Sequence, residues 1–410
     1  MDKKLINQGA LTLRSHRAAN SQIAVFIIIG LFFGVFVIGA DSFIISPLLP
    51  TITHEFKASV AETSASVTIY AFCYALGAPF FGPLGDRVNK RLLLMTGILI
   101  FLTGTLLCAL ANKLALFYMY RALAGIGASI FLPNVWAFIG DFFSGKQLNQ
   151  AVGIVMSALS LSIAIGVPLG TTLSQLSDWH MAFWGSALLT LVCILVLFFT
   201  IPKNLSVIQH PKNIGYFNSF STVLSTPNAV PALLITLFWM FGFYSVYTFL
   251  GTFIVDTFKF NTATTGYIFI AYGLSNFCAS FLGGKVMNYL GKKRSVLTNG
   301  GVSLLVMLVI AFWGNNLGIL LLALILLALT QGFGVTALQA YIVNVVPSNR
   351  ATVMSINSSF LYLGLTLGSL LGGLLLKFTG FKSITILAAF GFLLALLITL
   401  KLSQQPNRKP

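Results

Sequence analysis

Apolar stretches of about 20 residues recur along the whole chain, and the polar and charged residues lie mostly in the short intervals between them. A helix rises 1.5 Å per residue, so a stretch of this length spans the roughly 30 Å hydrocarbon layer of a bilayer. The pattern predicts an all-α integral membrane protein with twelve membrane-spanning helices. These lie over residues 22 to 46, 60 to 82, 92 to 111, 115 to 139, 150 to 173, 181 to 201, 229 to 255, 263 to 284, 295 to 313, 317 to 341, 351 to 376 and 382 to 402.

The longest polar stretch inside the chain divides six helices from six. We expect an N-terminal tail over residues 1–21, a first bundle over 22–201, a linker over 202–228, a second bundle over 229–402 and a C-terminal tail over 403–410. The two bundles share a repeat, which indicates duplicated six-helix halves. Phe56, Lys57, Tyr70, Gly82 and Lys90 recur 202 positions later as Phe258, Lys259, Tyr272, Gly284 and Lys292.

Composition and charge agree with this arrangement. The 410 residues are 57% hydrophobic and only 8% charged, whereas a soluble domain carries roughly 25% charged residues. The net charge of +16 would suggest a nucleic-acid partner in a soluble protein. Here most of the 24 lysines and arginines fall in loops on one side of the predicted bundle. The positive-inside rule therefore places both termini in the cytoplasm of a multi-pass protein of the plasma or inner membrane, and we expect no nucleic-acid partner.

The sequence shows no catalytic constellation. Its four cysteines lie inside predicted helices at unrelated spacings, which argues against a disulfide framework and a zinc site. Neither a phosphate-binding loop nor a metal-ligand pair nor a nucleophile with partners is visible, and the loops are too short for a nucleotide-binding domain. We expect no enzyme activity, no metal and no cofactor. A proton gradient is then the expected energy source.

The loop after the second predicted helix carries the most specific motif. It reads Gly-Pro-Leu-Gly-Asp-Arg-Val-Asn-Lys-Arg from residue 82 to residue 91. This order resembles the signature loop of the major facilitator superfamily, with Asn89 where that family usually has a second glycine. The resemblance implies a gating loop formed by Gly82, Asp86, Arg87, Lys90 and Arg91. In the second half Asn288 replaces the acid, so the charged latch is expected on one side only.

Three further stretches resemble the same family in order. The first helix ends in Asp41 and two prolines, as in drug and metabolite efflux branches, and the fourth carries Arg121 with two glycines. The fifth has Gly166, Pro168 and Gly170, a Gly-x-Pro-x-Gly form that resembles sugar, nucleoside and purine exporters more than multidrug antiporters. The resemblance implies two pseudo-symmetric six-helix bundles that work as a monomer by alternating access.

Asp41 and Arg121 carry the expected mechanism. Both lie at similar depth on helices that line the central cavity of the resembled fold, and buried charges normally pair. Desolvation favours a protonated carboxyl whereas an arginine favours the ionised one, so we hypothesise that Asp41 couples transport to protons and that solute and proton exclude one another. A static structural ion pair is the alternative. Glu62, at the outer end of the second helix, is a weaker coupling candidate, with a helix-start carboxylate as its other reading.

Neutral polar groups dominate the second half at mid-membrane depth. Each could bind a solute, or form an ordinary hydrogen bond between helices. The candidates for the substrate cavity are Tyr244, Tyr247, Tyr272, Asn276, Gln331 and Asn357, of which Tyr244, Gln331 and Asn357 are the first choices.

The preferred hypothesis is a secondary active transporter that exports a small organic solute, such as a drug, nucleoside or sugar, in exchange for protons. A facilitator or a proton-coupled importer of a small metabolite is the alternative within transport. A membrane receptor is the alternative outside it, but the chain lacks the large soluble region that such a receptor would use for signalling.

Overall fold

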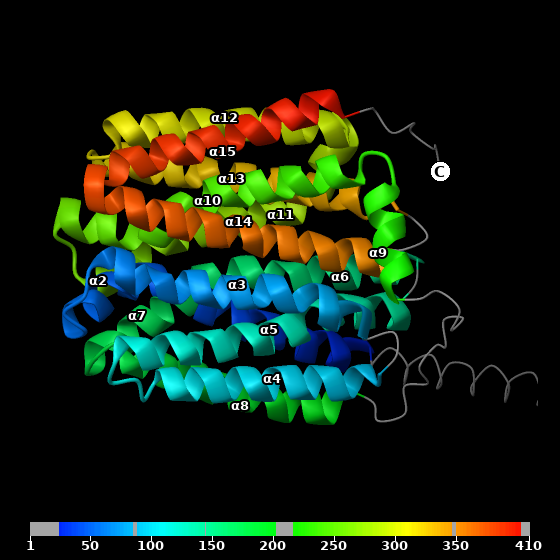
Figure 1. The fold of residues 1–410 in the computed structure, drawn as a ribbon, viewed down its shortest axis with the longest axis horizontal. Helices are drawn as coiled ribbons and strands as arrows, with labels where there is room; N and C mark the ends of the chain where they lie inside the picture. Colours follow the sequence, from blue (N-terminus) through cyan, green and yellow to red (C-terminus); the bar gives the residue numbers. More distant parts are fainter. Residues whose placement is uncertain (1–23, 85–87, 144, 202–215, 347–349, 403–410) are drawn as a thin grey trace, which may run out of the picture.

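The computed structural model describes residues 24–84, 88–143, 145–201, 216–346 and 350–402. Over these ranges the chain forms helices and no strand, and twelve of the helical spans are long and apolar enough to cross a bilayer. The long helices run roughly side by side along one axis, as Figure 1 shows. The predicted fold class is therefore confirmed, and each predicted segment overlaps one of these spans.

The first half contains six spans, two of them interrupted. The first helix, Ala24–Phe43, continues after a turn into α2, and the fifth span runs through a π-helical segment, η1, between α6 and α7. The bounds are α2 Ile45–Glu55, α3 Val60–Leu84, α4 Lys90–Cys108, α5 Leu114–Phe142, α6 Gly145–Leu161, η1 Ser162–Gly166, α7 Val167–Leu176 and α8 His180–Thr200.

The second half follows a short helix, α9, which crosses one end of the bundle (Figure 1). That helix lies in the stretch predicted as a linker and buries Val223. The first helix begins and α15 ends at this same end, which we call the α9 end; α2 marks the other, the α2 end. The bounds are α9 Tyr216–Ser225, α10 Ala229–Phe258, α11 Thr262–Leu290, α12 Lys292–Trp313, α13 Leu317–Ile342, α14 Arg350–Thr379 and α15 Phe381–Lys401.

The sequence repeat reappears in the way that helices begin and end. Lys57 and Lys259, 202 positions apart, both adopt the left-handed backbone, with φ of 50° and 57°. Two residues later, Ser59 and Asn261 cap the next helix through their side chains. The two halves thus use the same local geometry at matching positions, as duplication predicts.

A second pair of matching positions binds the C-terminal end of the sixth span in each half. The guanidinium of Arg91 donates to the carbonyls of Phe198 and Ile201 at the end of α8, at 2.9 and 2.5 Å. Lys293, 202 positions later, donates through Nζ to Leu400 and Leu402 at the end of α15, at 3.0 and 2.6 Å. A cation at a helix C-terminus satisfies carbonyls that have no partner within the helix and complements the helix dipole.

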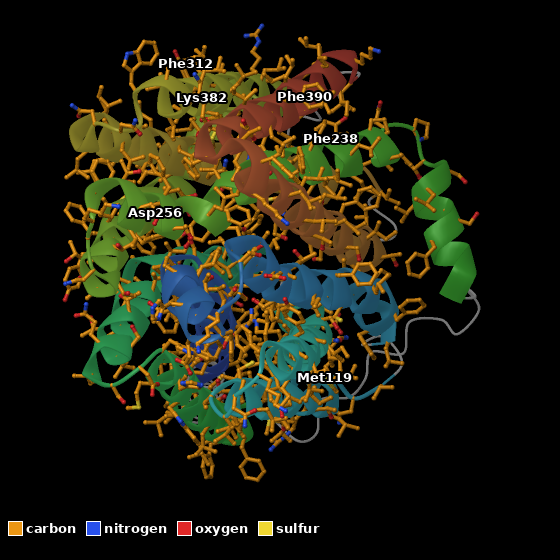
Figure 2. All side chains as sticks on the ribbon, turned by 60° about the vertical axis from the view of Figure 1, so that its left-hand side comes forward. Met119, Phe238, Asp256, Phe312, Lys382 and Phe390 are labelled. Carbon is orange, nitrogen blue, oxygen red and sulfur yellow. The ribbon has the colours of Figure 1, made fainter. Side chains whose placement is uncertain are left out.

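The halves meet where α3 packs on α14, where α2 packs on α10, and where the fifth span, formed by α6, η1 and α7, packs on α11. On the first pair, Ser355 and Ser359 donate to backbone carbonyls of α3 at 2.7 and 2.8 Å. On the second, Ser46 donates to the carbonyl of Tyr247 at 2.5 Å and accepts from the backbone N–H of Gly251. Figure 2 turns this end forward and shows α2 between the two halves. The α2 end is therefore closed in this conformation.

Candidate coupling and substrate site

A buried ion pair joins the first helix to α5. Arg121 Nη1 lies 2.5 Å from Asp41 Oδ2, and the two side chains are 1% and 0% exposed. Thr105 of α4 and Ser186 of α8 each approach the other carboxylate oxygen, at 3.4 and 3.3 Å. Four helices of the first half thus surround this pair, and an ion pair buried to this extent persists only when hydrogen bonds and close geometry offset its desolvation.

Tyr70 of α3 connects this pair to the boundary between the halves. The centre of its ring lies 4.3 Å from the Arg121 guanidinium, a cation–π contact, and its hydroxyl lies 3.0 Å from Ser42 Oγ. On its other side the ring is 6.4 Å from that of Tyr362 on α14, which stacks on Tyr74 at 3.5 Å. We call Tyr70, Tyr74 and Tyr362 the tyrosine stack. It reaches from the charged pair into the second half.

A second group of rings lies beside the first helix and spans both halves. Phe43 approaches Tyr247 edge-on at 5.3 Å and lies parallel to Tyr244 at 6.4 Å. Tyr247 also contacts Tyr272 at 6.0 Å. We call this group the aromatic cluster, and its members are Phe43, Phe243, Tyr244, Tyr247, Phe269 and Tyr272. Ring edges and faces with a few hydroxyls make a surface that suits organic solutes.

The predicted cavity residues divide into two groups. Tyr244, Tyr247 and Tyr272 come together in the aromatic cluster. The amides instead join helices: Asn357 accepts from Thr236 and donates to Gln339. Two buried polar atoms, Tyr247 Oη and Gln331 Nε2, have no hydrogen-bond partner among the described residues. The hydrogen-bonding capacity of these two atoms is therefore not used by the described residues.

The other two amides are held similarly. Gln331 accepts from the indole of Trp239 at 2.8 Å, and Asn276 accepts from Ser160 at 2.6 Å while donating to the carbonyl of Ala328. The contact between Ser160 and Asn276 crosses from α6 to α11, so it fixes how the halves meet. As first choices for solute contact, Gln331 and Asn357 stay predictions.

Glu62 occupies the first turn of α3. Its carboxylate accepts from the backbone N–H and the hydroxyl of Ser59, both at 2.7 Å, and Ser59 Oγ accepts from the Glu62 N–H. This is a capping box, which stabilises the start of a helix. Glu62 thus has the geometry of a helix-start carboxylate and makes none of the contacts described for Asp41. Its role in coupling stays a prediction.

The predicted gating loop is described in part, because Asp86 and Arg87 lie outside the described residues. Gly82 faces Ser355 of α14, and a Cβ at this glycine would lie 2.3 Å from the serine Oγ. Lys90 pairs with Asp141 at the end of α5. Together with the Arg91 contacts on α8, this holds the described basic residues of the loop against their own half.

The glycines of the fifth span pack against the first helix. A Cβ at Gly166 would lie 2.5 Å from the Cβ of Ala40, and one at Gly170 would overlap the Ile44 side chain. Pro168 is buried at the start of α7, where its missing N–H costs least. The π-helical segment ends at Gly166, and such segments frequently mark functional sites. These small residues let the two helices approach closely.

Several site residues carry no distinguishing signal in the sequence. Phe43, Tyr74 and Tyr362 lie in apolar stretches where aromatic residues are common, and nothing in the pattern separates them from lipid-facing rings. Thr105 and Ser186 are small hydroxyls of the kind that occur throughout the helices. Tyr70 did carry a signal, because its repeat partner is Tyr272, and both rings lie at the site.

Two pseudo-symmetric bundles, a buried charge pair and rings at the boundary between halves define a membrane transporter. The comparisons agree: a sequence model described as Major Facilitator Superfamily matches residues 31–316 and 232–410. The uncharacterized MFS-type transporter YwfA of Bacillus subtilis (strain 168) is 31% identical over 372 residues, which is 88% of this chain and 89% of that protein. The chain belongs to the major facilitator superfamily, whose members are transporters and not enzymes.

More distant relatives carry names that mention substrates. A "Probable sugar efflux transporter" of Pasteurella multocida (strain Pm70) is 24% identical, covering 91% of this chain and 92% of its own. "Multidrug resistance protein 2" of Bacillus subtilis (strain 168) is 25% identical, covering 88% and 90%. Among solved structures, the human organic anion transporter MFSD10 has a TM-score of 0.70 at 17% identity, covering 93% of this chain and 99% of its own. This last similarity concerns the fold alone.

Proposed function

We propose that the protein exports a small organic solute, such as a drug, nucleoside or sugar, in exchange for protons. The ion pair of Asp41 and Arg121 carries this proposal, since a carboxylate and a guanidinium at 0% and 1% exposure are rare inside a bilayer and usually mark a transport pathway. Protonation of Asp41 removes its charge and releases Arg121. The distant sugar efflux and multidrug relatives support the direction of transport.

The solute binds at the aromatic cluster, where Tyr247 Oη is an unpaired hydrogen-bonding group. Gln331 Nε2, beside Trp239 and outside the cluster, is a second unpaired group. The described polar contacts of Asp41 all come from the first half, so the solute does not compete directly with the proton for Asp41. The coupling instead runs through Tyr70. When Arg121 leaves Asp41, the ring that faces it moves too, and with it the tyrosine stack between the halves.

The proposal includes the setting of the transporter. The α9 end faces the cytoplasm of the plasma or inner membrane, as the basic loops predict. The protein works as a monomer without a cofactor, and the proton gradient supplies the energy.

The test uses proteoliposomes with ethidium, uridine and lactose as probes and a trapped pH-sensitive dye. We expect a pH gradient to drive accumulation of at least one probe, with proton movement in the opposite direction. Asp41→Asn should abolish gradient-driven accumulation and keep counterflow, the exchange of labelled for unlabelled probe. Asp256→Asn is the matched control, because this exposed carboxylate at the end of α10 (Figure 2) lies away from the ion pair.

Because Asp41→Asn leaves Arg121 buried without its counter-ion, the double variant Asp41→Asn/Arg121→Gln tests the same claim without a stranded charge. Gradient-driven accumulation that survives in the double variant refutes coupling at this pair. Transport of a probe down its gradient with no proton movement in the unaltered protein would favour the facilitator.

A further inference from the structure

The coupling carboxylate and the aromatic cluster lie on opposite sides of the first helix. Phe43 follows Asp41 by two residues, and two residues turn a helix by about 200°. Phe43 accordingly contacts Tyr244 and Tyr247 of the second half, whereas Asp41 contacts Thr105, Arg121 and Ser186 of the first. A proton that reached Asp41 from the solute site would have to pass through the packed helix.

A different opening lies on the Asp41 side. A crevice of about 30 Å³ runs between the first helix, α7 and α8. Roughly 10 to 15 Å³ is enough to hold one water molecule where polar partners are present. Asp41 and Ser186 supply those partners in an otherwise apolar wall.

Small residues account for the opening. Gly166, Ala40 and Gly185 put no bulk between the three helices, and the π-helical segment ends where the crevice begins, at Gly166. The fifth span, which contains this π-helical segment, ends with α7 at the α2 end, where the chain turns and α8 begins at His180. The crevice is therefore near the face that the basic loops predict to be outside, which is the side from which protons enter an antiporter.

Ser186 and Thr105 distinguish the two sides of the carboxylate. Both donate to the same oxygen, Asp41 Oδ1, at 3.3 and 3.4 Å. Thr105 is fully buried on α4, whereas Ser186 is partly exposed and lines the crevice. Of these two donors, only Ser186 lines the crevice, so only its hydroxyl can contact Asp41 and a crevice water together.

We propose that Ser186 relays protons between this crevice and Asp41, so that protons and solute use separate routes. The inference rests on the proposed proton coupling. In the step, a hydronium ion in the crevice gives a proton to Ser186 Oγ while the serine hydroxyl proton moves to Asp41 Oδ1. Water, the serine hydroxyl and a protonated carboxyl remain, and Arg121 is released.

The test compares Ser186→Ala with Thr105→Val in the proteoliposome assay. Each variant removes one weak donor from Asp41 Oδ1, and the two variants differ in whether that donor also lines the crevice. Proton transfer through a positioned group typically contributes 10²–10⁴-fold to a rate, so Ser186→Ala should slow the initial gradient-driven rate by at least about tenfold. Thr105→Val removes a donor that does not line the crevice, so it should slow the rate much less than Ser186→Ala does, and Ser186→Thr should restore the rate lost in Ser186→Ala.

A second variant blocks the crevice without touching Ser186 or Asp41. In Gly185→Leu the new Cβ meets only the movable end of Leu173, at 2.4 Å, so the helices can keep their positions. We expect slow proton-driven transport with normal counterflow. An unaltered rate in Ser186→Ala would overturn the relay whether or not Gly185→Leu is slow, and unaltered rates in both variants would also overturn the separate route. If Asp41→Asn still loses coupling in that case, the proposed antiport stands and only the separate route is wrong.

Discussion

Gly251 controls whether the α2 end can close. A Cβ at this position would lie 2.2 Å from the carbonyl oxygen of Ser46 and 2.5 Å from Pro47 Cα, whereas ordinary contact begins at 3.4 Å. These atoms belong to the α2 backbone, so no side-chain rotation relieves the overlap. In Gly251→Ala, α2 and α10 must separate, which also breaks the bonds that Ser46 makes to α10.

The magnitude follows from the overlap. Forcing a methyl group into a packed interface costs about 1–3 kcal/mol. If this cost falls on the closed conformation only, its population drops by roughly 5- to 150-fold relative to the conformation open at the α2 end. Alanine is also a better helix former than glycine by about 1 kcal/mol, so the helix itself should not be weakened.

Cross-linking measures the closed population. Thr51 Oγ1 and Thr262 Oγ1 lie 3.2 Å apart across the closed end, so a cysteine pair at these positions should oxidise readily once the four native cysteines are replaced. Gly251→Ala should slow this cross-link by the factor given above. Gly301→Ala, where a Cβ would meet nothing within 4 Å, is the matched control. A folded Gly251→Ala protein that cross-links at the rate of the control would refute the reasoning.

Two further substitutions test the coupling path and the second half. Tyr70→Phe keeps the ring against Arg121 and should preserve the ratio of protons to solute, whereas Tyr70→Leu removes a contact of about 0.5–2 kcal/mol and should lower it; equal ratios in a flux assay would exclude Tyr70 from coupling. Trp239→Phe strands the buried amide of Gln331, so stability should fall by about 1–3 kcal/mol, seen as a lower unfolding temperature in detergent. Adding Gln331→Leu should recover that loss, and a double variant as unstable as the single one would contradict the assignment.

The candidate site illustrates where sequence reasoning stops. Asp41 and Arg121 stood out because charges are rare in apolar stretches, and their depth along the helices suggested contact. Asn276 and Asn357 stood out in the same way but bond to neighbouring helices. A polar residue at mid-membrane depth can face a cavity or a neighbouring helix, and both satisfy its hydrogen bonds equally well.

The sequence by itself determined the twelve spans, the duplication and the presence of one charged pair, because hydrophobic length, repeat spacing and the cost of a buried charge are all local or one-dimensional properties. Only the tertiary structure decided which way each helix faces. That rotation puts Phe43 toward the second half and Asp41 toward Ser186, although the two residues are neighbours in the chain. It is set by packing among several helices at once, notably the close approach of Gly166 and Ala40, and no single stretch of sequence encodes it.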